Sequence, residues 1–139
     1  VSFLPPLSRA EAEGYWQSVF ASIADSSRVL LIIKDGERVT GTAQLDLCQK
    51  GNGLHRAEVL KVMVHTKARR QGLGRALMLA IEAEARAAHR TTLVLDTREG
   101  DPSNTLYQLV GWQLVGVIPQ FARSADGTLA GTALYYKLV

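Results

Sequence analysis

The sequence has only one cysteine, Cys48, so no disulfide can form within the chain. Its three histidines do not combine with this cysteine at the spacings of a zinc site, and we expect no bound metal. Long hydrophobic runs are also missing, since a run such as residues 29–33 is far too short to span a bilayer. The first residues lack the regions of a signal peptide. These absences predict a cytoplasmic protein that binds neither metal nor membrane.

Charge of one sign is not in large excess either. The chain has 16 Lys and Arg against 13 Asp and Glu, which gives a net charge of +3 and a pI near 9.2. With 47% hydrophobic and 21% charged residues, the composition differs from that of a disordered chain. A length of 139 residues suits one domain with one core. We therefore expect residues 1–139 to form a single soluble domain.

Hydrophobic periodicity and turn residues predict a mixed order of helices and strands. Ser8 and Glu11 form a capping-box pattern for a helix that ends near Asp25. Its apolar residues repeat at helical spacing and should face the core: Tyr15, Trp16, Val19, Phe20 and Ile23. Further helices are predicted at residues 73–88 and 101–111, and strands at residues 29–34, 38–47, 57–64, 91–96, 112–118 and 132–138. This order favours an α/β sheet with antiparallel hairpins and one strand-helix-strand unit.

The most informative segment runs from the apolar strand at residues 57–64 into a basic, glycine-containing loop and then a helix. The strand is almost continuously apolar, so we expect it to be central and covered on both faces. The first amides of a helix have no partner within the helix and lie at the positive end of its dipole. Gly72 and Gly74 leave room for an anion to approach these amides, and Arg69, Arg70 and Arg75 add positive charge. The pattern predicts a pyrophosphate site. A glycine loop that only packs before a helix is the structural alternative.

Two common phosphate motifs do not match this segment. A dinucleotide fingerprint needs a third glycine where Leu77 stands, and a P-loop needs Gly-Lys-Ser/Thr. Arg69-x-x-Gly72-x-Gly74 after an apolar strand instead resembles the coenzyme A signature of the GNAT family of N-acetyltransferases. Residues 106–112 resemble the family's Leu-Tyr-x-x-x-Gly-aromatic motif. The resemblance covers residues 28–139. Residues 43–50, 56–59 and 95–97 look especially similar to tabtoxin-resistance-type acetyltransferases.

The resemblance implies a fold, a cofactor and the residues that bind it. The implied fold is an α/β, GNAT-type mixed and mostly antiparallel twisted sheet, flanked by helices and splayed at the acetyl-CoA strand. The usual N-terminal strand and helix of such domains would be lacking here. Acetyl-CoA would be the cosubstrate, with no metal. Its binding residues would be Val62, Met63 and Val64 on the strand, Arg69, Arg70, Gln71, Gly72, Leu73, Gly74 and Arg75 in the loop and helix, and Asn104.

Two residues are candidates for the chemistry. Glu58 is the candidate base, because a carboxylate on a mostly apolar strand should have a raised pKa. The alternative is that it pairs with Lys61 or Arg56 on the sheet surface. Tyr107 is the candidate acid toward the leaving thiolate, since a phenol can donate to sulfur. Its alternative is a core tyrosine stacked on the sheet.

The expected reaction is direct attack of a primary amine on the acetyl thioester. The leading acceptor is a small molecule, such as an amino-acid-like toxin or antibiotic. A protein or peptide acceptor is the second reading. A non-enzymatic coenzyme A-binding or nucleic-acid-binding module is the third, although the arginines lack the interleaved aromatics of a single-strand platform. We expect a monomer or homodimer with no nucleic-acid partner.

Overall fold

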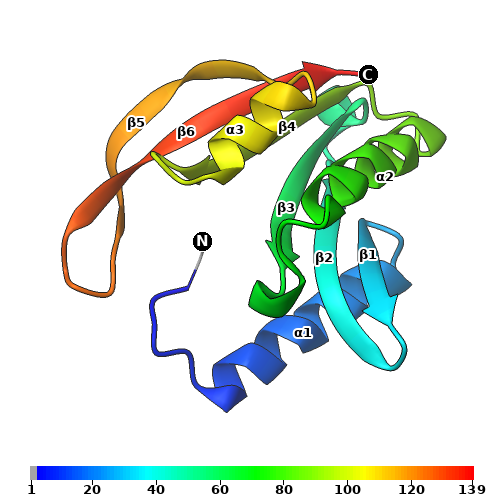
Figure 1. The fold of residues 1–139 in the computed structure, drawn as a ribbon. Helices are drawn as coiled ribbons and strands as arrows, with labels where there is room; N and C mark the ends of the chain where they lie inside the picture. Colours follow the sequence, from blue (N-terminus) through cyan, green and yellow to red (C-terminus); the bar gives the residue numbers. More distant parts are fainter. Residues whose placement is uncertain (1–2) are drawn as a thin grey trace.

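The computed structural model describes residues 3–139, which form a six-stranded sheet flanked by three α-helices (Figure 1). The helices are α1 (Arg9–Ala24), α2 (Leu73–Ala87) and α3 (Ser103–Leu109). The strands are β1 (Arg28–Asp35), β2 (Arg38–Leu47), β3 (Arg56–Val64), β4 (Thr92–Arg98), β5 (Gln113–Arg123) and β6 (Leu129–Leu138). The mixed α/β class expected from the sequence is confirmed.

The sheet has the order β1-β2-β3-β4-β6-β5, and every neighbouring pair except β3 and β4 is antiparallel. The β3–β4 pair is parallel because α2 connects the two strands, as a crossover of this kind requires. β3 is therefore central, as expected. The prediction that it is covered on both faces is wrong for its second half, since Met63 is 48% exposed.

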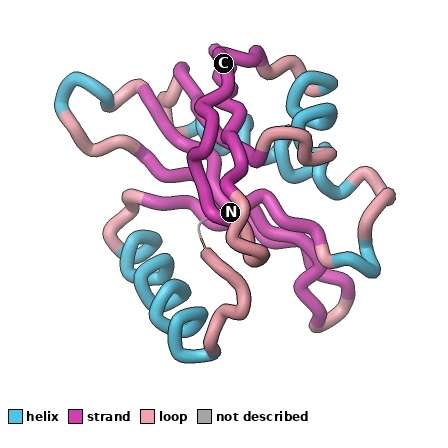
Figure 2. Tube along the Cα trace, turned by 90° about the vertical axis from the view of Figure 1, so that its left-hand side faces the viewer, coloured by secondary structure: helices cyan, strands magenta, loops and turns pink. Residues whose placement is uncertain are grey.

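The helices lie on opposite faces of the sheet. α1 lies on one side, whereas α2 and α3 lie on the other (Figure 2). The side chains of β2 follow this division: Ala43 and Leu45 join the core cluster with Leu77 and Ile81 of α2, and Gln44 between them accepts a hydrogen bond from Tyr15 of α1. The main core therefore lies between the sheet and α2.

α1 begins where the sequence predicts, but its apolar face is less buried than expected. Ser8 accepts from the backbone of Glu11, and the Glu11 side chain accepts from the backbone of Ser8, so the capping box is complete. Of the residues expected to face the core, only Val19 is buried, and Phe20 is 59% exposed. The expectation of a buried face is wrong because α1 lies near β1 on the side of the sheet opposite α2 and α3, so neither of these helices covers its outer face (Figure 2).

A β-bulge interrupts β3 in its middle. Thr42 pairs with Met63 and Gln44 with Leu60, so β3 has one more residue than β2 between these pairs. Lys61 lies in the bulge with a φ of 52°, which is uncommon for a residue other than glycine. The bulge bends the second half of β3, at the point where the strand leaves β4.

A buried ion pair joins α2 to the last strand. Glu82 of α2 is 2% exposed, and its Oε1 lies 2.9 Å from Nζ of Lys137 on β6. The same carboxylate accepts a hydrogen bond from Nε1 of Trp112 at 3.0 Å. Trp112 is buried, so this hydrogen bond lies in the core.

Candidate functional site

An opening between β3 and β4 is the central feature of the site. The two strands pair only from Arg56–Thr92 to Glu58–Val94. Beyond Glu58, β3 continues for six residues to Val64 with no ladder partner on its β4 side. Figure 1 shows the sheet parting here into a β1–β3 half and a β4–β6 half. An extended ligand can therefore add its own hydrogen bonds to the free edge of β3, on which Val62, Met63 and Val64 lie.

The loop after β3 leads into a helix start that has no side-chain cap. Gly72 is the N-cap of α2 with a φ of 73°, and no side chain bonds to the first amides. The first intrahelical bond runs from Ala76 to Gly72, so the amides of Leu73, Gly74 and Arg75 have no partner within the helix. α1, in contrast, has a complete capping box. Free amides at the positive end of a 15-residue helix form a site for a phosphate group.

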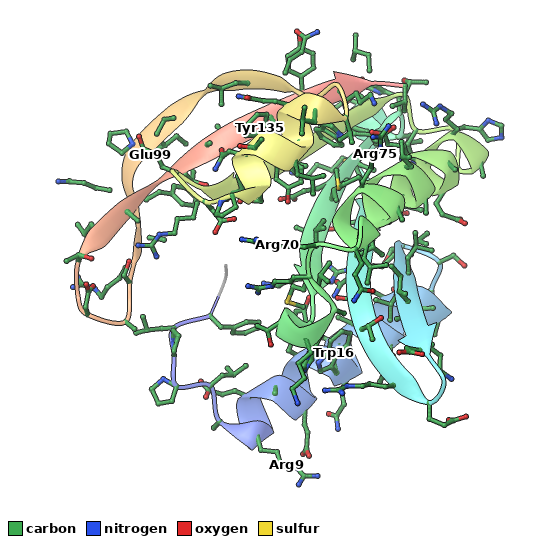
Figure 3. The ribbon with its side chains drawn as sticks, viewed as in Figure 1. Arg9, Trp16, Arg70, Arg75, Glu99 and Tyr135 are labelled. Carbon is green, nitrogen blue, oxygen red and sulfur yellow. The ribbon has the colours of Figure 1, made fainter. Side chains whose placement is uncertain are left out.

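Basic side chains surround these amides. Arg70 has a φ of 62°, so the loop contains a second residue with positive φ. Figure 3 shows its side chain beside the opening, away from the body of α2. Arg69 donates from Nε to the carbonyl of Val64 at 3.3 Å, which ties the loop to the end of β3. Arg69, Arg70, Gln71 and Arg75 are all exposed, as ligand-binding side chains need to be.

Gly74 also has a packing role. A Cβ atom at this position would lie 3.0 Å from Cδ2 of Leu106 on α3. At Gly72, no atom lies within 4 Å of such a Cβ, so only the positive φ requires glycine there. The alternative that the glycines serve only for packing is thus supported for Gly74, by the α2–α3 contact. It is not supported for Gly72.

Glu58 lies at the point where β3 and β4 part, and its carboxylate is not used in an ion pair within residues 3–139. Both expected alternative partners point elsewhere. Lys61 places Nζ 4.7 Å from the ring centre of Phe3 and 5.5 Å from that of Tyr15, and Arg56 contacts Sγ of Cys48 at 3.5 Å. The carboxylate of Glu58 is therefore free to act on a ligand.

The surroundings of Glu58 raise its pKa. Partial burial is the largest cause, followed by the negative charges of Asp96 and Asp46. Arg28 acts in the opposite direction, and its guanidinium lies 3.7 Å from Asp46. The raised pKa expected from the sequence has these three causes, of which only burial was foreseen. A carboxylate with a raised pKa is a better proton acceptor near neutral pH.

Tyr107 is buried on α3 between two aromatic rings. Its ring centre lies 5.8 Å from that of Tyr135 and 6.4 Å from that of Trp112. Burial and the nearby charge of Asp101 raise the pKa of Tyr107 to about 12, although the Ser103 side chain opposes this. The phenol therefore stays protonated at neutral pH. The burial of Tyr107 and its ring contacts also support the core-packing alternative. A packing role does not exclude a role as hydrogen-bond donor.

Asn104 holds the start of α3 in place. Its amide donates to the carbonyl oxygens of Arg98 and Asp101, and its Oδ1 accepts from the Tyr135 hydroxyl at 2.8 Å. Tyr135 is 2% exposed and projects from β6 behind α3 (Figure 3). Asn104 therefore has a clear role in positioning α3, beside the cofactor contact that the sequence predicts.

A cavity of about 630 Å³ lies on the other side of the opening, between the first residues and the β5–β6 arm. Asp96 and Arg98 of β4 form one wall, Phe3 and Pro5 another, and residues of the arm such as Arg123 a third. Asp96 lies two residues after Val94, the partner of Glu58, and therefore on the same face of the sheet. The cavity is of the size that small-molecule sites have.

Sequence reasoning missed the charged residues around Glu58. Asp46 pairs with Glu58 across β2 and β3, and Asp96 approaches from β4. Neither carries a local motif, because their proximity depends on strand register. A signal was present in the neighbouring residues, since Asp46 stands between Leu45 and Leu47 and Asp96 follows Leu95.

Residues 3–139 contain no group of three or more His, Cys, Asp or Glu side chains placed to hold a metal ion. None of the helices in this part of the chain is both long and apolar enough to cross a membrane.

Comparison with known proteins agrees with this geometry. Residues 3–112 match the model of the family described as Acetyltransferase (GNAT) family. A ribosomal-protein-alanine N-acetyltransferase from Brucella melitensis has a similar structure, with a TM-score of 0.81 at 22% identity, over 91% of this chain and 78% of that one. The protein yncA from Salmonella typhimurium, solved with its cofactor acetyl-CoA, gives 0.77 at 18% identity over 95% and 74%. A proposed phosphinothricin N-acetyltransferase gives 0.82 at 18% identity over 96% and 82%. At these identities the structural matches establish the fold alone.

Proposed function

The chain belongs to the acetyltransferase (GNAT) family, and we propose that it transfers the acetyl group of acetyl-CoA to the primary amine of a small molecule. One observation carries the proposal: the free edge of β3 leads directly to the uncapped amides of α2. An extended arm that ends in a pyrophosphate needs these two features in this order. The structure of yncA with acetyl-CoA has the same fold and supports this assignment.

The residues present fit acetyl-CoA. Val62, Met63 and Val64 lie on the strand edge that would pair with the amides of the pantetheine arm. The amides of Leu73, Gly74 and Arg75 would hold the pyrophosphate, and Gly72 keeps the approach open. Arg69, Arg70 and Gln71 would contact the phosphates from the exposed loop. Asn104 would act mainly by fixing the start of α3.

Glu58 is the proposed base. Bound acetyl-CoA supplies an acetyl group that is already activated as a thioester. The acceptor's ammonium group must lose a proton before its nitrogen can attack the thioester carbonyl, and Glu58 would accept that proton directly or through one water. Its raised pKa suits this role; partial burial is the main cause of it, and Asp96 and Asp46 add to it. The site would also favour the reaction by holding the amine beside the thioester.

Tyr107 is proposed to donate a hydrogen bond to the departing sulfur. With a pKa of about 12, the phenol is a weaker acid than an ordinary thiol, whose pKa is near 8.5. It would therefore stabilise the thiolate by hydrogen bonding more than by full proton transfer. Tyr107→Phe keeps the packing and should lower kcat roughly 10-fold, as the loss of one charge-assisted hydrogen bond predicts. An unchanged kcat would leave Tyr107 with the packing role alone.

A small acceptor is favoured by the cavity beside Glu58, which the first residues and the β5–β6 arm enclose.

One observation favours a peptide acceptor as the second candidate. Leu114, Val115 and Phe121 on β5 are 48%, 65% and 54% exposed, so the arm offers an apolar surface to a chain. Ribosomal-protein-alanine N-acetyltransferases from two bacteria are among the structural matches.

The test is an acetyl-transfer assay with the purified protein and acetyl-CoA. Acceptors would be a panel of small primary amines and a matched set of peptides with free N-termini, with release of the free thiol as the readout. Faster turnover of small amines than of peptides supports the proposal. Turnover of peptides alone would support the second candidate, and turnover of neither would contradict both.

A further inference from the structure

The cavity that Asp96 lines has opposite charges toward its two ends along β4. The end nearest the β3–β4 opening is acidic, because Asp96 lies in the cavity wall and its charge acts on Glu58. The end that lies further along β4 and in the arm contains the guanidinium groups of Arg98 and Arg123. This separation of charge is what a molecule with an amine at one end and an oxyanion at the other requires.

The two arginines are free to bind an anion. Neither has an ion-pair partner within the part of the chain from residue 3 to residue 139. Arg123 uses one nitrogen to donate to the carbonyl of Gly127 at 3.2 Å, which fixes its direction and leaves its other donors available. Arg98 lies near Asp126, whose pKa is lowered mainly by hydrogen bonds from Thr128 and to a smaller extent by Arg98.

The acidic end is suited to an amine for separate reasons. Asp96 accepts one hydrogen bond, from Thr132 at 2.9 Å through Oδ2. Arg28, the nearest guanidinium, is engaged with Asp46 and with Gln44. Lys61 is held over the rings of Phe3 and Tyr15 by cation–π contacts and makes no ion pair within residues 3–139, although its charge acts on Asp96. Since neither Glu58 nor Asp96 is in an ion pair in this part of the chain, both carboxylates can still attract a cationic amine.

Distance along the strand limits the substrate. Asp96 and Arg98 are two residues apart on one face of β4, which corresponds to about 7 Å along the strand. An amine and an oxyanion separated by two to four bonds match such a site.

We propose that the acceptor is a small amino acid, a primary amine with a carboxylate or similar oxyanion a few bonds away, oriented by Arg98 and Arg123 with its amine toward Glu58 and Asp96. The inference rests on the proposed function. It assigns a role to two residues outside the coenzyme A signature. It also argues against peptide N-termini, which have the amine without the nearby carboxylate.

The experiment compares free amino acids with their carboxamides as acceptors for the full chain and acetyl-CoA. The amide keeps the amine and size and removes the anion. We expect the preferred amino acid to exceed its amide at least 10-fold in kcat/KM, as loss of a charge-assisted hydrogen bond predicts. Arg98→Gln and Arg123→Gln should each raise KM for the acid and leave the amide nearly unchanged.

Arg9→Gln is the matched control. Arg9 lies at the start of α1 and is directed to solvent (Figure 3); it does not line the cavity, and it is paired only with Glu13. This variant removes the same charge and should keep the preference for the acid.

Equal rates for acids and amides, or a preference that survives in Arg98→Gln and Arg123→Gln, would overturn the inference while the proposed function stands. Binding of acetyl-CoA with no acetylated amino acid would also overturn it. Failure to bind acetyl-CoA would instead contradict the proposed function.

Discussion

At the scale of single residues, Glu58 combines a cost to stability with a use in chemistry. Its pKa is raised by burial and by two neighbouring carboxylates, so the folded protein binds a proton here more tightly than the unfolded chain does. Stability from this group is therefore greatest below its unfolded pKa, and it falls as the pH rises through the range between the unfolded and the folded pKa. Such a penalty is common at sites that need a base near neutral pH.

Glu58→Gln should consequently lower activity and slightly raise thermal stability at neutral pH. We expect kcat to fall about 100-fold or more, as the removal of a general base predicts, with the affinity for acetyl-CoA unchanged. The acidic limb of the pH–rate profile should disappear with it. A thermal melt and a pH–rate profile check both effects. A profile identical to that of the wild type would mean that another group is the base.

Asp96→Asn offers a second measurement of the same coupling. Removing this charge takes away one cause of the raised pKa of Glu58. The acidic limb should then move to lower pH, since Glu58 would lose its proton more easily. A limb that moves to higher pH, or does not move, would show that the charge of Asp96 does not raise the pKa of Glu58.

At the scale of elements, local signals predicted the three α-helices and six strands, but β5 and β6 extend beyond the predicted residues 112–118 and 132–138, to Arg123 and from Leu129. Ser8 and Glu11 specify the start of α1 because capping depends on residues three apart. The bulge at Lys61 was not predictable, because it depends on how β3 pairs with β2. The glycine loop was found by its motif, whereas the role of Asp46 and Asp96 depends on strand register and was missed. The exposed face of α1 was missed because periodicity does not reveal which partner covers a helix.

Because α3 contacts α2 at Gly74, the stability change caused by Gly74→Ala should have opposite signs with and without the Leu106 side chain. Gly74→Ala should lower stability by up to about 1 kcal/mol, because the new methyl group meets Leu106 and cancels the better helix propensity of alanine. In a Leu106→Ala background the same change should raise stability by about 0.5 to 1 kcal/mol, since the space is then open. Urea unfolding of the four proteins measures this coupling. Additive effects would contradict the packing role of Gly74.

At the scale of the whole molecule, the closed end of the sheet opening is held by a buried ion pair. Glu82 and Lys137 connect α2, which covers β2 and β3, to β6 in the other half. Lys137 also donates to the carbonyl of Val110 at 2.7 Å. The pair therefore contributes to the relative position of the two halves that form the site.

Lys137→Met should destabilise the protein by about 2 to 4 kcal/mol, because it leaves the carboxylate of Glu82 buried with only Trp112 and the more distant Arg86 as partners. The double variant Glu82→Leu, Lys137→Met should lose less, since no unpaired charge remains. Denaturant unfolding of both variants decides this. A double variant less stable than the single one would show that the charges themselves hold the two halves together.

The proposed function requires acetyl-CoA to bind at the start of α2, and calorimetric titration of acetyl-CoA into the protein measures this binding. We predict a dissociation constant in roughly the micromolar range for the wild type, a range usual for enzyme substrates. Binding should be lost in Arg69→Ala, Gly72→Ala. Gly36→Ala is the matched control, because Gly36 has a φ of 61° and equally open surroundings but lies in the β1–β2 turn. A folded wild-type protein that does not bind, or a double variant that binds as well as Gly36→Ala, would contradict an acetyl-CoA site at the start of α2.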